Sequence, residues 1–468
     1  MARQRSSFPQ GSTPRPGVPG GVAADHAADQ PGAPPTRRHF LAGAGLGAAG
    51  LVSGPLLAAC APTSGSSGSS SGSGTSSGTI TIGFVSPRTG AAAGFGEPDA
   101  YVLDLARKAL AAGLTIGGKK YDVTIVDKDS QSNPQRSAQV ANDLLHGSNV
   151  DLMLTTSTPE TVNPVSDACE AAGVPCISTV VPWEAWYFGR GATPDKPFTY
   201  TFHFCFGVDE FAKTYSGMWP QVSTNKKVAV MWPNDADGNA IRKSLGPLLV
   251  KAGFTIVDPG AYTDGTNDYS SQIAKFKAEN CEIFNTFPIP PDFATFWQQA
   301  AQQGYKPKIA QIAKTGLFPS QVEALGAIGV GLAGGAYWHP TFPYSSPLTG
   351  VSSKQLGDGY QNANGKQWNQ QLGASLALFD VAAAALKAAA NPKDKAGLAK
   401  AIGALSVDTP VGHLAWGKGP VPNVVATPII GGQWVSAASG SKYKLDFVVC
   451  DNSTDSNVPV ASKLRPYA

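Results

Sequence analysis

Short apolar segments that predict β-strands alternate with amphipathic segments that predict helices from residue 79 onward. The first unit is a strand over 80–84 followed by a helix over 98–110. A strand over 121–127 and a helix that begins at Asn133-Pro134 form the second unit, because asparagine is a common N-cap and proline is favoured in the first helical turn. Repeated strand–helix order predicts a parallel sheet with helices on both faces.

This alternation occurs in two series, which predicts two α/β lobes. The first series ends with a strand over 174–178, and an irregular stretch over 179–197 follows it. The strands of the second series are expected at 228–232, 254–257, 283–286 and 308–312. An alanine-rich helix over 368–390 and strands within 411–449 then return the chain to the lobes. The expected fold is two parallel-type sheets flanked by helices and joined by a multi-strand hinge, with a cleft at the carboxyl ends of the strands.

The pattern also predicts where the chain passes between the lobes. The first lobe is expected over 79–206, with a return segment over 339–405. The second lobe is expected over 207–338, with a return segment and C-terminal tail over 406–468.

Residues 1–59 combine a disordered extension with the features of an export leader. The twin arginines Arg37 and Arg38 precede an apolar, small-residue run over 40–59, an order typical of twin-arginine signals. Cys60 follows Leu-Ala-Ala and resembles a bacterial lipobox cysteine, which is acylated, for example with palmitate. A membrane-spanning helix is the alternative, disfavoured by the glycines and the proline in the run. We expect a lipid on Cys60 to hold the protein on the extracytoplasmic face of a bacterial membrane, with 60–78 as lipidated cysteine and Gly/Ser linker.

Charge and cysteine content narrow the classes of function. The chain has 36 basic and 33 acidic residues, and residues 1–59 hold five arginines and two aspartates, so 31 of each remain. This balance gives no electrostatic basis for binding nucleic acid. The later cysteines form no C-x-x-C pair and the six histidines are scattered, which disfavours zinc binding. Cys169 and Cys176 could form a disulfide in an oxidising exterior.

Two sequence patterns resemble known cofactor-binding or metal-binding motifs, but their surroundings do not fit those motifs. Residues 329–334 fit the dinucleotide fingerprint but precede a strand instead of opening a helix. Residues 235–238 hint at a calcium loop, but the glycine is misplaced and no bidentate glutamate follows. We find no nucleophile–base pair in the sequence, and we expect a protein that is not an enzyme and that uses no metal or cofactor.

Four stretches together carry a resemblance to a known family. They are Ile82-Gly-Phe-Val-Ser-Pro-Arg-Thr-Gly90 with Phe95-Gly96, residues 127–134, residues 171–178 and Asp237-Gly238. In this order and spacing they resemble substrate-binding lipoproteins of ABC importers, of the leucine/isoleucine/valine-binding type. The resemblance implies a type I periplasmic-binding fold that closes on a small ligand and docks on permease subunits.

The resemblance places ligand contacts in the first lobe. Phe95 falls where the family has an aromatic ring over the ligand side chain, although it could equally pack the first helix on its sheet. The turn with Thr156, Ser157 and Thr158 ends a strand and opens a helix, so its hydroxyl and N–H groups could hold a carboxylate. The alternative for Thr158 is that it caps the helix.

The stretch after the strand over 174–178 departs from the family. Proline stands near the threonine that the family uses to grip an amino-acid carboxylate. Trp183 and Trp186 follow it, and they are candidates for flat walls around a larger or aromatic ligand. Their alternative role is to anchor the irregular loop on the lobe.

The second lobe departs further. The family places a tyrosine and a glutamate for the ligand ammonium near 287–290 and 312–315, but no acidic residue occurs there and Lys314 stands about where the glutamate is expected. A lysine repels an ammonium and attracts an anion, unless it is simply an exposed surface residue. Asp237 could accept a ligand donor or cap the helix that follows it. We therefore expect a ligand other than Leu, Ile or Val, such as an aromatic or other small carboxylate.

The function that these observations favour is capture of a small solute for an ABC importer. A sensory receptor module of the same fold is the first alternative, although the sequence carries no signalling domain. A secreted hydrolase is a weaker alternative because no catalytic triad can be placed. Gene neighbours would distinguish transport from sensing.

Overall fold

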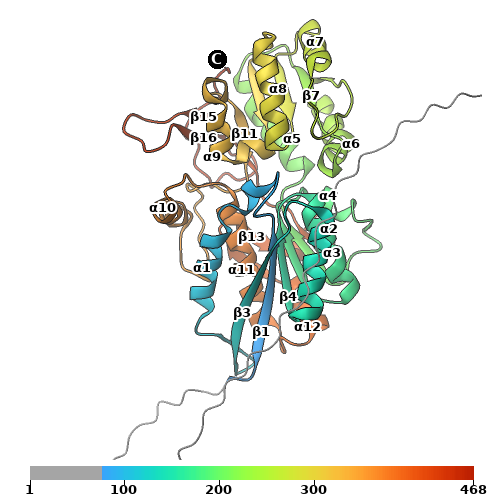
Figure 1. Cartoon of the computed structure of the whole chain (residues 1–468), viewed down its shortest axis with the longest axis vertical. Coiled ribbons are helices and arrows are strands. Elements are labelled where there is room, and N and C mark those ends of the chain that lie inside the picture. Colours follow the sequence, from blue (N-terminus) through green and yellow to red (C-terminus); the bar gives the residue numbers. More distant parts are fainter. Residues whose placement is uncertain (1–75, 468) are drawn as a thin grey trace, which may run out of the picture. The chain divides into compact units, whose positions relative to one another are not determined.

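The computed structural model describes residues 76–467, which form two lobes built on one seven-stranded sheet each (Figure 1). Arg37, Arg38, Cys60 and most of the predicted linker lie outside the described residues. The expected fold class is confirmed.

The first sheet has the order β14-β6-β5-β4-β1-β3-β2, and all its neighbours are parallel except β2 and β3. Its strands are β1 (Thr79–Ser86), β2 (Leu114–Ile116), β3 (Lys119–Asp129), β4 (Leu152–Thr156), β5 (Cys176–Thr179), β6 (Thr201–Phe204) and β14 (Val424–Val425). Every residue of the central strands β4 and β5 is buried, as expected for a sheet that is covered on both faces.

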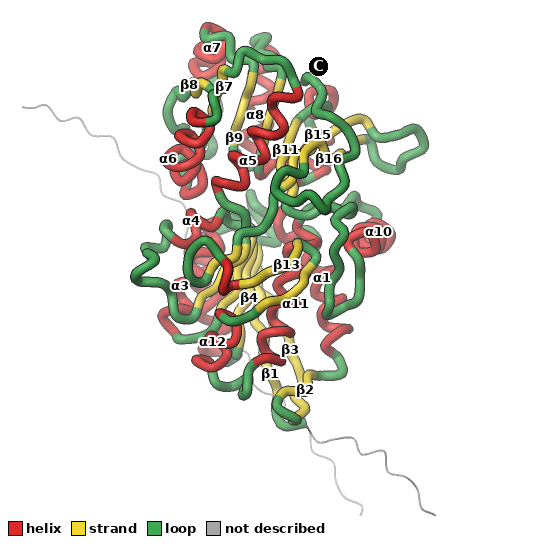
Figure 2. Tube along the Cα trace, turned by 180° about the vertical axis from the view of Figure 1, so that it is seen from behind, coloured by secondary structure: helices red, strands yellow, loops and turns green. Residues whose placement is uncertain are grey.

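The helices of the first lobe lie on both faces of this sheet. They are α1 (Asp99–Leu110), α2 (Pro134–Asn142), α3 (Pro159–Ala172), α4 (Trp183–Tyr187), α11 (Gln371–Ala388) and α12 (Lys395–Gly403). The helices α2 and α3 pack together on one face, and α1 packs with α11 on the other (Figure 1). The hairpin of β12 (Ser406–Thr409) and β13 (Gly412–Ala415) lies beside α11 (Figure 2).

Helix α11 forms the core of one side of the first lobe. It has 18 residues, and its length and apolar composition alone would allow it to cross a membrane. However, 83% of it is buried within the structure. A helix that is apolar on every side and enclosed in this way is typical of a protein core.

The second sheet has the order β16-β15-β11-β10-β9-β7-β8, with β15 and β16 antiparallel at one edge. Its strands are β7 (Lys227–Met231), β8 (Thr255–Val257), β9 (Ile283–Thr286), β10 (Ile309–Ile312), β11 (Ala333–Ala336), β15 (Ile430–Ser436) and β16 (Leu445–Asp451). Its helices are α5 (Val208–Met218), α6 (Ala236–Lys251), α7 (Ser270–Ala278), α8 (Pro290–Gln302) and α9 (Pro319–Ala324), while α10 (Ser353–Asn364) follows the second passage between the sheets.

The chain passes between the two sheets three times. The first passage follows β6, the second follows β11 and the third joins β14 to β15. The strand pairing places the third passage later than the predicted boundary at 406, because Val424 and Val425 pair in parallel with His203 and Phe204 at the edge of the first sheet.

The cysteines in the described part of the chain are unpaired. Cys169, Cys176, Cys205, Cys281 and Cys450 are all free and buried. The Cys169–Cys176 disulfide that the sequence allowed is therefore not formed. Both side chains pack inside the apolar cluster between α3 and its sheet.

Candidate functional site

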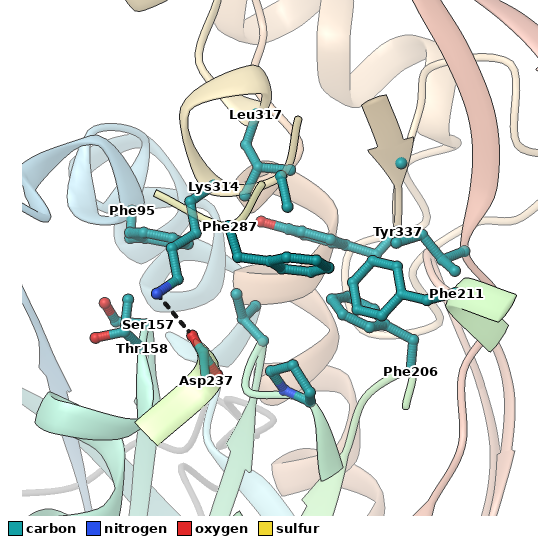
Figure 3. A pocket seen from close by; sticks show the side chains of 15 residues that line it. Phe95, Ser157, Thr158, Phe206, Phe211, Asp237, Phe287, Lys314, Leu317 and Tyr337 are labelled. Carbon is teal, nitrogen blue, oxygen red and sulfur yellow. Dashed lines mark ion pairs between the residues drawn. The ribbon is translucent and has the colours of Figure 1, made fainter. Parts of the chain in front are cut away.

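A cavity lies between the lobes, at the carboxyl ends of strands from both sheets (Figure 3). It is lined by Phe95, Ser157, Thr158, Val180, Pro182, Phe206, Phe211, Asp237, Phe287, Ala313, Lys314, Leu317, Gly335, Tyr337 and Ile429. Its volume is about 40 Å³, which is room for only a few water molecules. Entry of a ligand of amino-acid size therefore requires its walls to move apart.

Aromatic rings form most of the apolar wall. The ring of Phe206 stacks on Tyr337 with centroids 5.7 Å apart and meets Phe211 edge to face at 4.9 Å. Phe211 in turn meets Phe287 edge to face at 5.1 Å. Phe95 lies on the opposite side of Lys314 from Tyr337 (Figure 3). Offset and edge-to-face contacts of this kind are the favourable arrangements for aromatic pairs and suit an aromatic guest.

The Tyr337 ring is held in place by two buried hydrogen bonds. Its hydroxyl donates to Gln371 Oε1 at 2.7 Å, and Gln371 Nε2 donates to Thr156 Oγ1 at 2.5 Å. Thr156 ends β4, whereas Tyr337 follows β11 in the other sheet. The chain of bonds therefore ties the end of one sheet to an aromatic wall carried by the other.

Ser157 and Thr158 begin α3 on the first-lobe side of the cavity. Ser157 is fully buried, and its Oγ has no hydrogen-bond partner within the described protein. Thr158 is the N-cap residue by position, yet its side chain makes no capping hydrogen bond. Both hydroxyls lie at the helix N-terminus, where backbone N–H groups and the helix dipole favour an anion.

Lys314 and two aspartates form a buried ion cluster on the second-lobe side. Lys314 Nζ lies 2.7 Å from Asp235 Oδ2 and 3.0 Å from Asp237 Oδ2. Asp235 also caps α6 by accepting from Gly238 N at 2.6 Å. Asp237 has a second oxygen, Oδ1, that is buried without a partner among the described residues. The cap that the sequence suggested for Asp237 is supplied by Asp235 instead.

The ion cluster shifts the pKa values of its members. Burial raises the pKa of Asp237 to about 7, although the nearby Lys314 ammonium opposes this rise. Burial alone would lower the pKa of Lys314, but the carboxylates of Asp237, Asp235 and Glu160 outweigh it and hold this pKa well above its ordinary value. Lys314 is thus a charged, buried lysine and not the exposed surface residue that was the alternative.

Three residues of the cavity wall have an uncommon backbone conformation. The φ angles are 148° at Ser157, 77° at Val180 and 43° at Lys314. Each follows the carboxyl end of a strand, and a positive φ at a β-branched residue such as Val180 is costly. Strain of this kind persists where the surrounding fold enforces it, often at a ligand site.

Of the residues predicted from sequence, Phe95, Ser157, Thr158, Asp237 and Lys314 line the cavity. Thr156 does not line the cavity, but it accepts a hydrogen bond from Gln371, which in turn holds the lining residue Tyr337. In the described part of the chain, no group of three or more His, Cys, Asp or Glu is arranged to hold a metal ion.

The two tryptophans do not line the cavity. Trp186 is completely buried, stacks on His203 with centroids 4.9 Å apart and donates from Nε1 to Ser166 Oγ at 3.3 Å. Trp183 packs against Gly207, where a Cβ would come within 2.1 Å of its Nε1. Both therefore anchor the loop on the first lobe, and the neighbouring Pro182 lines the cavity in their place.

Three aromatic residues of the wall were not identified from sequence. Phe206 belongs to the first passage between the sheets, Phe211 lies in α5 directly after it, and Tyr337 begins the second passage. The only sequence signal for them is that aromatic residues cluster next to the expected lobe boundaries, which does not distinguish hinge packing from ligand contact. Phe287, by contrast, lies at the end of β9, in a stretch that the sequence placed at the site.

Known proteins share both the sequence pattern and the fold. A family model described as periplasmic binding protein matches residues 79–435. The Leu/Ile/Val-binding protein homolog 7 of Brucella suis biovar 1 (strain 1330) is 25% identical over 240 residues, which are 49% of this chain and 57% of that protein. An amino acid binding protein of Pseudomonas aeruginosa is 24% identical over 229 residues, 48% of this chain and 58% of the relative. The matched region thus spans less than two thirds of the length of these curated relatives.

Solved structures of low sequence identity share the fold. The branched-chain amino acid transporter substrate binding protein LivJ of Streptococcus pneumoniae, in complex with isoleucine, has a TM-score of 0.62 at 18% identity, over 79% of this chain and 99% of that one. A solute binding protein of an ABC transporter from R. palustris, in complex with 4-hydroxybenzoate, has a TM-score of 0.63 at 16% identity. The match covers 80% of this chain and 96% of that one.

Proposed function

The chain belongs to the family of periplasmic binding proteins, and we propose from this premise that it is an extracytoplasmic lipoprotein that captures a small organic ligand between its lobes. It delivers the ligand unchanged to the permease of an ABC importer. The observation that supports this most is the interlobe cavity, which is lined by aromatic rings and by Ser157 and Asp237, whose Oγ and Oδ1 atoms have no hydrogen-bond partner among the described residues.

The mechanism follows from the three chain passages between the lobes. A ligand that contacts both Ser157 and Asp237 joins groups carried by different lobes, so it binds the closed arrangement more tightly than the open one. It can shift the lobes toward closure only by that difference in affinity. Closure around apolar rings also removes ligand and protein surface from water, which adds to the affinity.

The ligand class is a small molecule with an apolar or aromatic part and a polar head, such as an amino acid or an aromatic carboxylate. Both classes occur among structural neighbours, which include complexes with isoleucine and with 4-hydroxybenzoate. We propose Phe95, Ser157, Thr158, Asp237 and Lys314 as ligand-binding residues, together with the aromatic wall formed by Phe206, Phe211, Phe287 and Tyr337.

Membrane attachment is proposed from sequence alone. Arg37 and Arg38 would direct export of the folded protein, and an acyl group on Cys60 would hold it at the membrane. Labelling cells with a palmitate analogue tests this, because the Cys60→Ser variant should lose the label and leave the membrane fraction. A label retained by that variant would contradict the proposed attachment.

Transport itself is tested in two steps. The ligand that co-purifies with the protein is first identified, and its uptake is then measured in cells that lack the gene. Loss of uptake, restored by the wild-type gene and not by a variant with substitutions in the cavity, is the expected result. Uptake that persists while a transcriptional response to the ligand disappears would contradict delivery to an importer and favour the sensory alternative.

A further inference from the structure

The cavity contains its own ammonium group. Among the described residues, Asp237 and Lys314 are the only charged side chains that line it, and they contact each other across 3.0 Å. Lys314 Nζ is also 2.7 Å from Asp235 Oδ2, so two carboxylates hold one buried ammonium. Among the described residues that line the cavity, Asp237 is thus the only acidic one, and it is already paired with this lysine.

We propose that Lys314 occupies, from within the protein, the place that a ligand ammonium would need, so that the cavity selects aromatic carboxylates that lack an α-ammonium group. This inference rests on the proposed solute-binding function and narrows its ligand class. Lys314 acts here as a specificity-determining residue that both excludes one ligand group and attracts another.

The exclusion follows from like charges in a buried site. An ammonium that approached Asp237 Oδ1 would lie next to the Lys314 ammonium, which is bonded to the other oxygen of the same carboxylate. Two cations at such separation repel strongly when both are withdrawn from water. A zwitterionic amino acid would have to overcome this repulsion, whereas its deaminated analogue would not.

The attraction follows from the hydrogen-bond donors that remain. A lysine ammonium has three donors, and the two aspartates use two of them. The third is available to an acceptor, as is the unpartnered hydroxyl of Ser157 on the facing lobe. A carboxylate has the two oxygens needed to accept from both lobes at once, and the N-terminus of α3 adds favourable potential. Burial holds the Asp237 carboxyl partly neutral near pH 7, which reduces its repulsion of the ligand anion.

The apolar part of the ligand is then directed toward the rings. Phe211 and Phe287 meet edge to face, and Tyr337 stacks with Phe206 beside them. Among the described lining residues, these rings leave no charged or amide group on that side of the cavity. An aromatic or bulky aliphatic group fits this wall, and a polar side chain would lose its hydration without replacement.

Matched ligand pairs test the inference on the wild-type protein. L-Phenylalanine and 3-phenylpropanoate differ only in the α-ammonium group, as do L-leucine and 4-methylpentanoate. Calorimetric titration at pH 7 should give at least tenfold tighter binding for the deaminated member of the aromatic pair. Equal or tighter binding of either amino acid would overturn the inference and leave the proposed function intact. Failure of both carboxylates to bind would also overturn it, while the proposed function would still be judged by the ligand that co-purifies.

Variants separate the role of Lys314 from general effects. Lys314→Ala frees Asp235 and Asp237 for an external ammonium, so the preference should shift toward L-phenylalanine by at least tenfold. Lys354→Ala is the control, because Lys354 is exposed, pairs with Asp358 and does not line the cavity. This variant should leave the preference unchanged. Asp237→Asn retains Lys314 and serves if Lys314→Ala does not fold. It should keep the preference for 3-phenylpropanoate, and a preference for L-phenylalanine in this variant would contradict the inference.

Discussion

The carboxylate of Glu160, in the first lobe, accepts a hydrogen bond of 3.3 Å from the backbone N–H of Ala236 in the second lobe. Glu160 stands in the first turn of α3 and Ala236 begins α6, so the N-termini of two helices meet across the cleft through one carboxylate. A negative group is favoured at both positions because each helix N-terminus carries partial positive charge. This contact helps to hold the lobes together next to the cavity.

Removing this contact should favour the open arrangement. Glu160→Ala is expected to weaken ligand binding severalfold, because a helix-terminal charge contact contributes about 0.3–1 kcal/mol. Small-angle scattering of the ligand-bound variant should show a larger radius of gyration than the wild type. Glu279→Ala, which removes an exposed partner of Lys227, is the control and should change neither quantity. Unchanged affinity in Glu160→Ala would show that the contact does not favour closure.

The hydrogen bonds from Tyr337 through Gln371 to Thr156 should act as a unit. Tyr337→Phe leaves Gln371 Oε1 buried without its donor, which is expected to cost about 1–3 kcal/mol of unfolding free energy. Thr156→Val removes the other end of the same chain. The double variant should cost less than the sum of the two single variants, as measured by denaturant unfolding. Strict additivity would mean that the two bonds are independent.

Binding of an aromatic carboxylate should depend on the protonation of Asp237. Its pKa is raised to about 7, mainly by burial, so the neutral form that does not repel an anion predominates below that pH. Affinity should therefore rise as the pH falls from about 8 to about 6, and Asp237→Asn should flatten this dependence. The other groups that act on Asp237 are Lys314, Asp235 and Glu160. An affinity that rises with pH would contradict this account.

A second buried carboxyl should make stability depend on pH. Asp99 is fully buried between Ser86 and Ser375, and burial raises its pKa from 3.8 to about 7. Because the folded pKa lies above the unfolded one, the stability it contributes is full below about pH 4 and is lost as the pH rises to 7. The loss is about 4 kcal/mol. Asp99→Asn should reduce the dependence of the unfolding free energy on pH between pH 4 and 8. If the slope is unchanged, the pH dependence arises from other groups.

The five cysteines from Cys169 onward should behave as inert thiols in the folded protein. Burial raises the pKa of Cys169, and its neighbour Cys176 raises it further, so Cys169 forms no reactive thiolate at neutral pH. A thiol reagent should modify none of the five in the native state and all five after unfolding without reductant. Modification of only three after unfolding would indicate a disulfide that the structure lacks.

The sequence predicts best those features that depend on a few adjacent residues. Asn133 accepts from Arg136 N as the N-cap of α2, as the sequence predicts. This cap could be predicted because capping depends only on neighbouring residues. The short edge strand at Val424–Val425 was not predicted, because only its pairing with β6 makes it a strand.

The residues of the candidate site also divide into those that local sequence patterns located and those that depend on the tertiary fold. Ser157 and Lys314 follow strands that the alternation had located, and the carboxyl ends of parallel strands meet at one edge of a sheet. Phe206 and Tyr337 come from passages between the lobes, so their stacking depends on how the two sheets are arranged. Trp186 was expected near the ligand, but its large apolar ring is fully buried against His203 instead. Apolar burial and ligand contact select the same residue types, and sequence alone does not separate them.

Calorimetric titration of the mature wild-type protein with 3-phenylpropanoate, followed by recovery of the ligand, tests the central claim most directly. We expect one ligand per chain, a negative heat-capacity change from burial among the rings, and recovery of the compound chemically unchanged. Binding that survives replacement of Phe287 by Asp on the cavity wall, or recovery of an altered compound, would contradict capture between the lobes without chemical change.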